Sequence, residues 1–157
     1  MPRQNLITEG ALHRLAVQAG IRRLSKKAIG LLRGALESFV VEVGGQAAIL
    51  ASHSRRNTLM RRDAQAALAR KGIRVYSDGP VKGLMQHAKF LRLLKQVVPE
   101  LPNRLSKNAG FALQSGAEGY MLGLLEGCQR IVQAQGMRTL KSKAVMAALQ
   151  NLRQGGC

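Results

Sequence analysis

The sequence predicts an all-α fold built from two copies of a three-helix unit, packed on each other within one chain. Three observations lead to this prediction: an aliphatic composition, apolar residues at helical spacing, and an internal repeat. Apolar residues make up 46% of the 157 residues but aromatic residues only 3%. The core must therefore consist of Leu, Ala, Val, Ile and Met.

The internal repeat is first visible in the tetrapeptide "RLSK", which occurs at residues 23–26 and 104–107. With the same offset of 81 residues and no gap, Thr58-Leu59 aligns with Thr139-Leu140. Because several clusters keep one register, we interpret the chain as a duplication with a linker near "SDGPVKG", a stretch typical of breakers. The predicted divisions are a first copy at residues 1–77, a linker at 78–86 and a second copy at 87–157.

The first copy is predicted to form a short helix, a long helix and a second short helix. Thr8 can cap the first helix and Gly20 ends it, while Ser25 caps the long helix. The last helix covers about residues 60–71 and stops at Gly72. Apolar residues recur every three or four positions along the long helix, at Ile29, Leu32, Leu36, Phe39, Val43, Ala47 and Leu50.

The second copy is predicted to have the same order of elements. A short helix over about residues 88–98 is ended by Pro99, Ser106 caps a long helix, and a last helix covers about residues 142–153. The apolar positions of its long helix are Leu113, Ala117, Tyr120, Leu124, Cys128 and Ile131.

Each long helix needs more cover than its own copy can supply. A helix of about 28 residues is about 42 Å long, and two short helices leave much of it exposed. We expect the two copies to cross antiparallel at their long helices, because an α-solenoid usually needs three or more similar repeats. This crossing brings the first loop of one copy to the second loop of the other, with Arg23 near Thr139 and Arg104 near Thr58.

The charge predicts a polyanionic partner. Lys and Arg number 25 against 8 Asp and Glu, giving a net charge of +17. Solubility alone calls for only about 2–8 charges, so nucleic acid is the first expectation and an anionic membrane surface the second. Helix N-termini and basic side chains gathered at the loops favour phosphate binding without base reading. The basic residues in or beside the loops are Arg22, Arg23, Lys26, Lys27, Arg55, Arg56, Arg61, Arg62, Arg104, Lys107, Arg138, Lys141 and Lys143.

Several other classes of protein are disfavoured. Cys128 and Cys157 do not suggest a disulfide framework, and the three histidines are too dispersed for a metal site, so we expect neither metal nor cofactor. No apolar run reaches the roughly 18 residues of a membrane span, and the start "MPRQN" does not predict secretion. We also expect no enzyme, because no nucleophile–base pair or GxxxxGK phosphate loop is present.

These motifs resemble the histone fold. Residues 5–77 resemble histone four, through "RRNTL" followed by Asp63 and a closing Tyr76, and residues 87–153 resemble histone three, most clearly in "ALQSGAEGYMLGLLE". The whole chain is similar to the fused histone doublets of giant DNA viruses. The resemblance implies an intramolecular handshake pseudo-dimer of two histone-fold units.

The resemblance also implies roles for individual residues. Arg23 and Arg104 match arginines that enter the DNA minor groove, and Thr58 and Thr139 match the threonines that pair with them. Arg56 and Asp63 match a structural clamp that rigidifies the second loop, whereas the second copy has Met137 and Ala144 at these positions. The other expected DNA-binding residues are Arg14, Arg22, Lys26, Arg55, Arg56, Arg92, Lys107, Arg138 and Lys143.

The implied protein partners are a second histone doublet and another copy of this chain. His53 and Tyr76 match residues that face the other histone pair. Self-pairing through the second half would use Ile131, Ala134, Met137, Ala144 and Ala147, in a region more apolar than is usual in the family.

The function expected from these observations is DNA packaging. Two doublets would join through their second halves, bind a partner doublet and double-stranded DNA, and form the central part of a nucleosome-like particle. The expected location is a viral particle, a viral factory or a host nucleus, in chromatin. Two alternatives stay open: a stand-alone histone that coats or bends DNA, and a histone-fold pair of the transcription-factor type.

Overall fold

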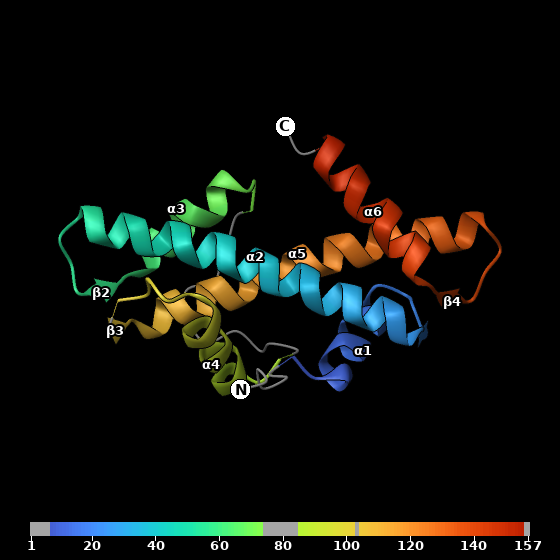
Figure 1. Ribbon diagram of the computed structural model, residues 1–157, viewed down its shortest axis with the longest axis horizontal. Coiled ribbons are helices and arrows are strands. Elements are labelled where there is room, and N and C mark those ends of the chain that lie inside the picture. The colour runs from blue at the N-terminus through green and yellow to red at the C-terminus, as the bar shows by residue number, and fades with distance from the viewer. Residues whose placement is uncertain (1–6, 74–84, 103, 156–157) are drawn as a thin grey trace. The chain divides into compact units, whose positions relative to one another are not determined.

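The computed structural model describes residues 7–73, 85–102 and 104–155, and the side chains of residues 153–155 lie outside that description. Its helices confirm the predicted all-α class and the order short, long, short in each copy (Figure 1). The helices of these residues are α1 (Glu9–Gln18), α2 (Lys26–His53), α3 (Arg61–Arg70), α4 (His87–Val97), α5 (Lys107–Ala134) and α6 (Ser142–Gly155). The strands are β1 (Arg23–Leu24), β2 (Thr58–Leu59), β3 (Arg104–Leu105) and β4 (Thr139–Leu140).

The predicted N-terminal caps are confirmed. The Thr8 hydroxyl accepts a hydrogen bond from the Ala11 amide at 3.1 Å. Ser25 and Ser106 do the same for amides in the first turns of α2 and α5, each at 3.1 Å. Gly20 and Gly72, with φ of 93° and 74°, follow α1 and α3 as predicted. These left-handed positions suit glycine because other residues crowd their Cβ there.

The strands join the two copies in parallel pairs. Arg23 is paired with Thr139 in β1·β4, and Thr58 is paired with Arg104 in β2·β3. These pairings confirm the predicted proximity of the loops. The strands themselves were not predicted, because two residues are too few to show a period of two.

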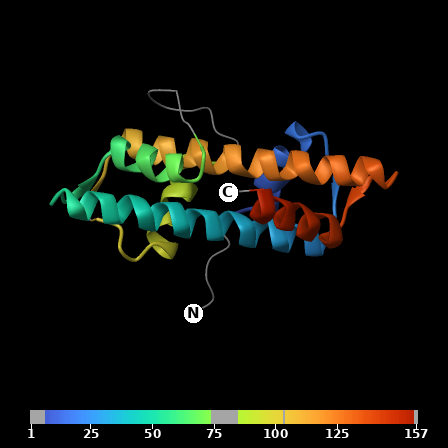
Figure 2. The ribbon, with the colours of Figure 1, turned by 90° about the horizontal axis from the view of Figure 1, so that it is seen from above.

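The chain divides into two compact units, and neither unit is a single copy. Unit 1 comprises Met1–Ile7 and Glu37–Gly119, which include β2 and β3. Unit 2 comprises Thr8–Leu36 and Tyr120–Cys157, which include β1 and β4. Each unit therefore combines part of α2 with part of α5, the intertwining that a handshake requires. In unit 1, α3 (green) lies beside the first half of α5 (Figure 2).

The core is aliphatic, as the composition predicted. Most of the expected apolar positions in α2 and α5 are buried, and Leu50, Tyr120 and Ile131 are half-buried. Leu24 and Leu105 of the repeated tetrapeptide were expected in the core but are only half-buried. Their strand partners Leu140 and Leu59 are buried completely, because those residues face inward from the other side of each pair.

Some glycines of the long helices permit close helix packing. A Cβ on Gly44 would lie 2.8 Å from Val98 Cγ2, and a Cβ on Gly116 would collide with Leu68 Cδ2. These glycines let α2 approach the end of α4, and let α5 approach α3, within unit 1. Gly45 and Gly119 have no atom within 4 Å of a built Cβ, so packing among the described residues does not explain them.

Helix α2 corrects the expectation about membrane spans. By length and composition it is apolar enough to cross a membrane, with a mean hydropathy of 1.2 in its most apolar window. Its uninterrupted apolar runs are short, because glycines and a few charges stand between the apolar residues, and run length alone therefore gave no signal. Of that window 44% is buried in the protein, and the core helix of a soluble protein has the same composition.

Candidate nucleic-acid interface

In unit 2, the β1·β4 loop pair gathers arginines around Thr139. Arg23 is exposed beside the half-buried Thr139, its partner in the strand register. The Ser25 amide donates to the Leu140 carbonyl at 3.0 Å, so the strand leads directly into the cap of α2. A cavity of about 390 Å³ adjoins the pair, and its basic lining residues are Arg22, Arg23 and Arg138.

In unit 1, the β2·β3 loop pair repeats this geometry with the copies exchanged. Arg104 is exposed beside the half-buried Thr58, and the Ser106 amide donates to the Leu59 carbonyl at 3.0 Å. Helix α5 begins at the next residue, the exposed Lys107. A helix start supplies free backbone N–H groups and the positive end of the helix dipole. Both loop pairs thus offer an anion an arginine, a lysine and a helix start.

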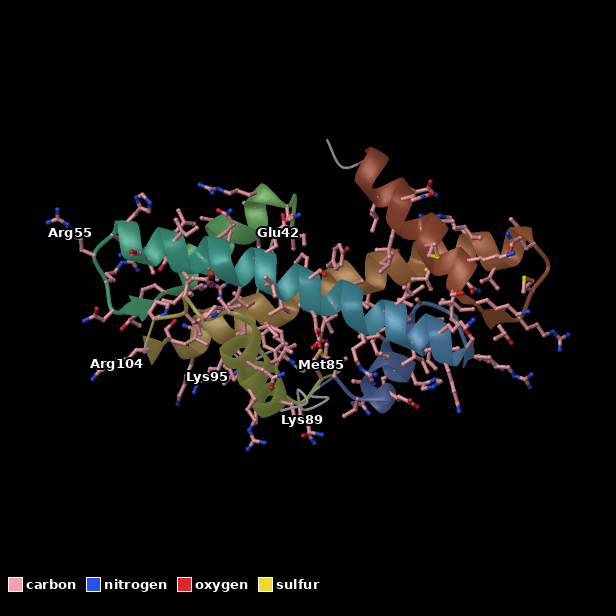
Figure 3. The ribbon with its side chains drawn as sticks, viewed as in Figure 1. Glu42, Arg55, Met85, Lys89, Lys95 and Arg104 are labelled. Atoms are coloured by element: carbon pink, nitrogen blue, oxygen red, sulfur yellow. The ribbon has the colours of Figure 1, made fainter. Side chains whose placement is uncertain are left out.

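Arg55 adds a cation held in an unusual backbone conformation. Its φ is 56°, in the left-handed region, and its side chain points outward from the turn between α2 and β2 (Figure 3). The position 81 residues later is Gly136, with φ of 66°. Both long helices therefore end in the same turn, but only the first copy has a side chain there.

The predicted clamp is present in unit 1. Arg56 Nη2 lies 2.7 Å from Asp63 Oδ1, and Asp63 Oδ2 accepts the Met60 amide at 2.9 Å. The Asp63 side chain is only 5% exposed, so one buried carboxylate ties the β2 loop to the start of α3. At the matching positions of unit 2, Met137 is half-buried and Ala144 is 6% exposed.

The other predicted DNA-binding residues are on the surface but are not all at the loops. Arg14 on α1 and Arg92 on α4 are exposed outside the strand pairs. The exposed residues in or beside the loop pairs are Arg22, Lys26, Lys107, Arg138 and Lys143. Lys95, which was not predicted, lines a cavity together with Arg104. It lies on α4, away from the loops in sequence, so loop motifs gave no signal for it.

The predicted protein-contact residues differ in exposure. His53 and Ala134 are exposed, Ile131, Met137 and Ala147 are half-buried, and Tyr76 lies outside the described residues. Ala144 does not suit the expected interface, because its side chain already packs inside unit 2. Ile131 and Ala134 line a hollow of about 420 Å³ between α5 and α6.

Reactive groups are scarce in the described part of the chain. No group of three His, Cys, Asp or Glu side chains in it could hold a metal ion. Burial raises the pKa of the Cys128 thiol to about 11, partly offset by a backbone hydrogen bond. The thiol is therefore protonated and unreactive near neutral pH.

Comparison with known proteins agrees with this geometry. The sequence model of the family "Histone", which describes the core histone domain, matches residues 12–71, which lie in the first copy. Among solved structures, the crystal structure of the histone from Methanopyrus kandleri is similar, with a TM-score of 0.67 and 21% identity. That alignment covers 90% of this chain and 91% of the other.

The chain has a histone fold. The alignment with the archaeal protein is too long to fit in either copy alone, so the structural similarity extends over both. A histone fold is consistent with DNA packaging and with association with DNA or chromatin. The histone family and fold are those of structural proteins, not of enzymes.

Proposed function

We propose that this histone-fold protein is a fused doublet that packages DNA by holding its backbone at the two loop pairs. The observation that carries the proposal is the repeated register of an exposed arginine beside a threonine from the other copy, once in β1·β4 and once in β2·β3. A net charge of +17 supports it, because a polyanion offsets the self-repulsion of such a chain.

In the proposed contact, Arg23 and Arg104 enter the minor groove where it faces the protein. The adjacent hydroxyls of Thr139 and Thr58 orient the guanidinium groups. Lys26 and Lys107, the first residues of α2 and α5, contact the flanking phosphates. None of these groups reads a base edge, so binding is largely independent of sequence and follows the width of the minor groove.

The proposed assembly is the central part of a nucleosome-like particle. Two copies of the chain meet at the α5–α6 hollow that Ile131 and Ala134 line. The first half meets a second histone doublet at the exposed His53, with Tyr76 contributing as the resemblance implies. The proposed location is a viral particle, a viral factory or a host nucleus.

A stand-alone histone that coats or bends DNA is the second candidate. The burial of Ala144 favours it, because this burial removes one of the residues expected to join two second halves. The replacement of the clamp by Met137 and Ala144 also leaves this region without the ion pair found in unit 1.

The loop assignment is tested by replacing both minor-groove arginines. Arg23→Ala with Arg104→Ala should weaken binding to unrelated DNA sequences equally. The slope of log affinity against log salt should fall by about 0.9 for each phosphate that the variant no longer neutralises. Titrations at several salt concentrations measure this slope.

The control for net charge is Arg70→Ala with Lys71→Ala, which removes two exposed cations at the end of α3. This variant should keep most of the wild-type slope. An Arg23/Arg104 variant whose slope equals that of the wild type would refute the loop assignment.

Nuclease protection separates the two candidate functions. DNA is reconstituted with this protein alone and with a partner doublet, then digested. One discrete protected length that requires the partner supports the nucleosome-like particle. A ladder formed by this protein alone supports the stand-alone histone.

A further inference from the structure

Unit 1 contains a cavity that the proposed DNA contact does not use. Its volume is about 970 Å³, and it lies between α4, the segment after it, β3 and the start of α5. Its apolar lining includes Leu91, Leu101, Leu105 and Phe111. Cavities of this size and character are typical of sites that take an apolar group.

One wall of the cavity is fixed by a hydrogen-bonded aromatic pair. The His87 ring stacks on Phe111, with ring centroids 4.2 Å apart. His87 Nδ1 lies 2.6 Å from Gln114 Oε1, and the buried Gln114 amide also donates to the Met85 carbonyl at 2.9 Å. These contacts tie the start of α4 to α5, so this wall exists before any ligand arrives.

The rim of the cavity is positively charged. Lys95, Arg104 and Lys107 line it from α4, β3 and α5 respectively, and none of its described lining residues is acidic. Lys95 and Arg104 extend to the same side of the unit (Figure 3). The proposed contact uses Arg104 and Lys107 for the DNA backbone, but that backbone has no bulky apolar group to fill the floor below them.

We propose that this cavity binds an acidic segment of a partner protein, which inserts one bulky apolar side chain between α4 and α5. Three separated cations call for several separated negative charges, and a single cavity calls for a single apolar anchor. An extended acidic peptide provides both. Because it shares Arg104 and Lys107 with DNA, its binding excludes DNA from the β2·β3 loop pair, a consequence that rests on the proposed function.

The direct test uses a short peptide of Asp and Glu residues around one central Phe, titrated in the absence of DNA. The comparison peptide has Ser in place of Phe and carries the same charge. The Phe peptide should bind about tenfold more tightly, because a buried aromatic side chain contributes that much or more. Equal affinities would mean that only surface charge attracts the peptide, and would overturn the proposal.

Matched protein variants locate the site. Lys95→Ala removes a lining cation, whereas Lys89→Ala removes a cation on the same helix that does not line the cavity. Only Lys95→Ala should weaken binding of the Phe peptide beyond the decrease common to both variants. Leu101→Ala should reduce the preference for Phe over Ser, with the exposed Val17→Ala as its control. Unchanged helical circular dichroism shows that each variant folds.

Competition with DNA then tests the exclusion separately. The Phe peptide should displace DNA more completely from an Arg23→Ala variant, which relies on the β2·β3 pair, than from an Arg104→Ala variant, which relies on the β1·β4 pair. If peptide binding requires the cavity but DNA binding is indifferent to Arg104, the proposed function fails while the cavity proposal stands. If DNA binding depends on Arg104 but Lys95→Ala and Lys89→Ala behave alike, the cavity proposal fails.

Discussion

At the scale of single residues, Arg55 is the clearest difference between the two copies. It holds a left-handed conformation, with φ of 56°, that the second copy assigns to Gly136. Such a conformation costs a residue with a Cβ about 1–2 kcal/mol. A strained residue at a basic surface loop is consistent with a role in binding rather than in stability.

The two turns can be compared by exchange. Arg55→Gly should leave the unfolding free energy unchanged or raise it by up to about 1 kcal/mol, because strain is relieved. It should also weaken DNA binding, since one cation is removed. Gly136→Ala should lower the stability by about 1 kcal/mol. Urea unfolding and DNA titration measure the two effects, and a strongly destabilised Arg55→Gly would contradict this explanation.

Residues with local partners were the most predictable. Ser25 and Ser106 cap the helices that directly follow them, and Asp63 pairs with Arg56 only seven positions away. The left-handed turn at Arg55 was not predicted, because the sign of φ depends on how the loop closes onto β2. Lys95 was missed for a similar reason, since its place beside Arg104 depends on the packing of α4.

At the scale of elements, the adjacent glycines of α2 have different surroundings. A Cβ on Gly44 would lie 2.8 Å from Val98 Cγ2 at the end of α4, whereas a Cβ on Gly45 would meet no atom of the described residues within 4 Å. Val98 is buried and branched at Cβ, so it has little freedom to move away.

This difference predicts opposite effects for one substitution. Gly44→Ala should lower the unfolding free energy by about 1–3 kcal/mol through overpacking. Gly45→Ala should raise it by about 0.5–1 kcal/mol, because alanine favours the helix. Each variant is the other's control in chemical denaturation. Equal effects of the two substitutions would show that α2 and α4 do not pack as closely as described.

Helix positions followed from the sequence more closely than strand positions. Apolar spacing and caps indicated α2 and α5 with starts at Lys26 and Lys107, because those signals lie within or directly before each helix. The strands have two residues each and partners in the other copy, so local patterns do not reveal them. Half-burial of Leu24 and Leu105 follows from that pairing, which only the packed chain determines.

At the scale of the whole molecule, the copies in the sequence are not the compact units of the fold. Both units contain a part of α2 and a part of α5. The repeat offset of 81 residues made this intertwining predictable, because neither copy could cover its own long helix. Contacts with other chains were less predictable, since exposed apolar residues such as Ile49 have no unique partner in a sequence.

Separation of the copies should therefore prevent independent folding. Residues 1–77 alone lack β3 and β4, and with them the strand partners of both loops. We expect this fragment to be largely unfolded, or to pair with itself, and to regain the native helix content when residues 78–157 are added. Circular dichroism and sedimentation measure these states. A monomeric fragment that unfolds cooperatively would contradict the interleaved arrangement.

The two arginine–threonine pairs belong to one polypeptide, which has a consequence for how the protein can change. In a dimer of identical chains every substitution occurs twice, so both ends change together. Here a mutation at Arg23 alters one pair and leaves Arg104 as it was. Affinity for DNA can thus be adjusted in half-steps. The Arg56–Asp63 pair, which has no counterpart in the second copy, is an asymmetry that a homodimer could not acquire.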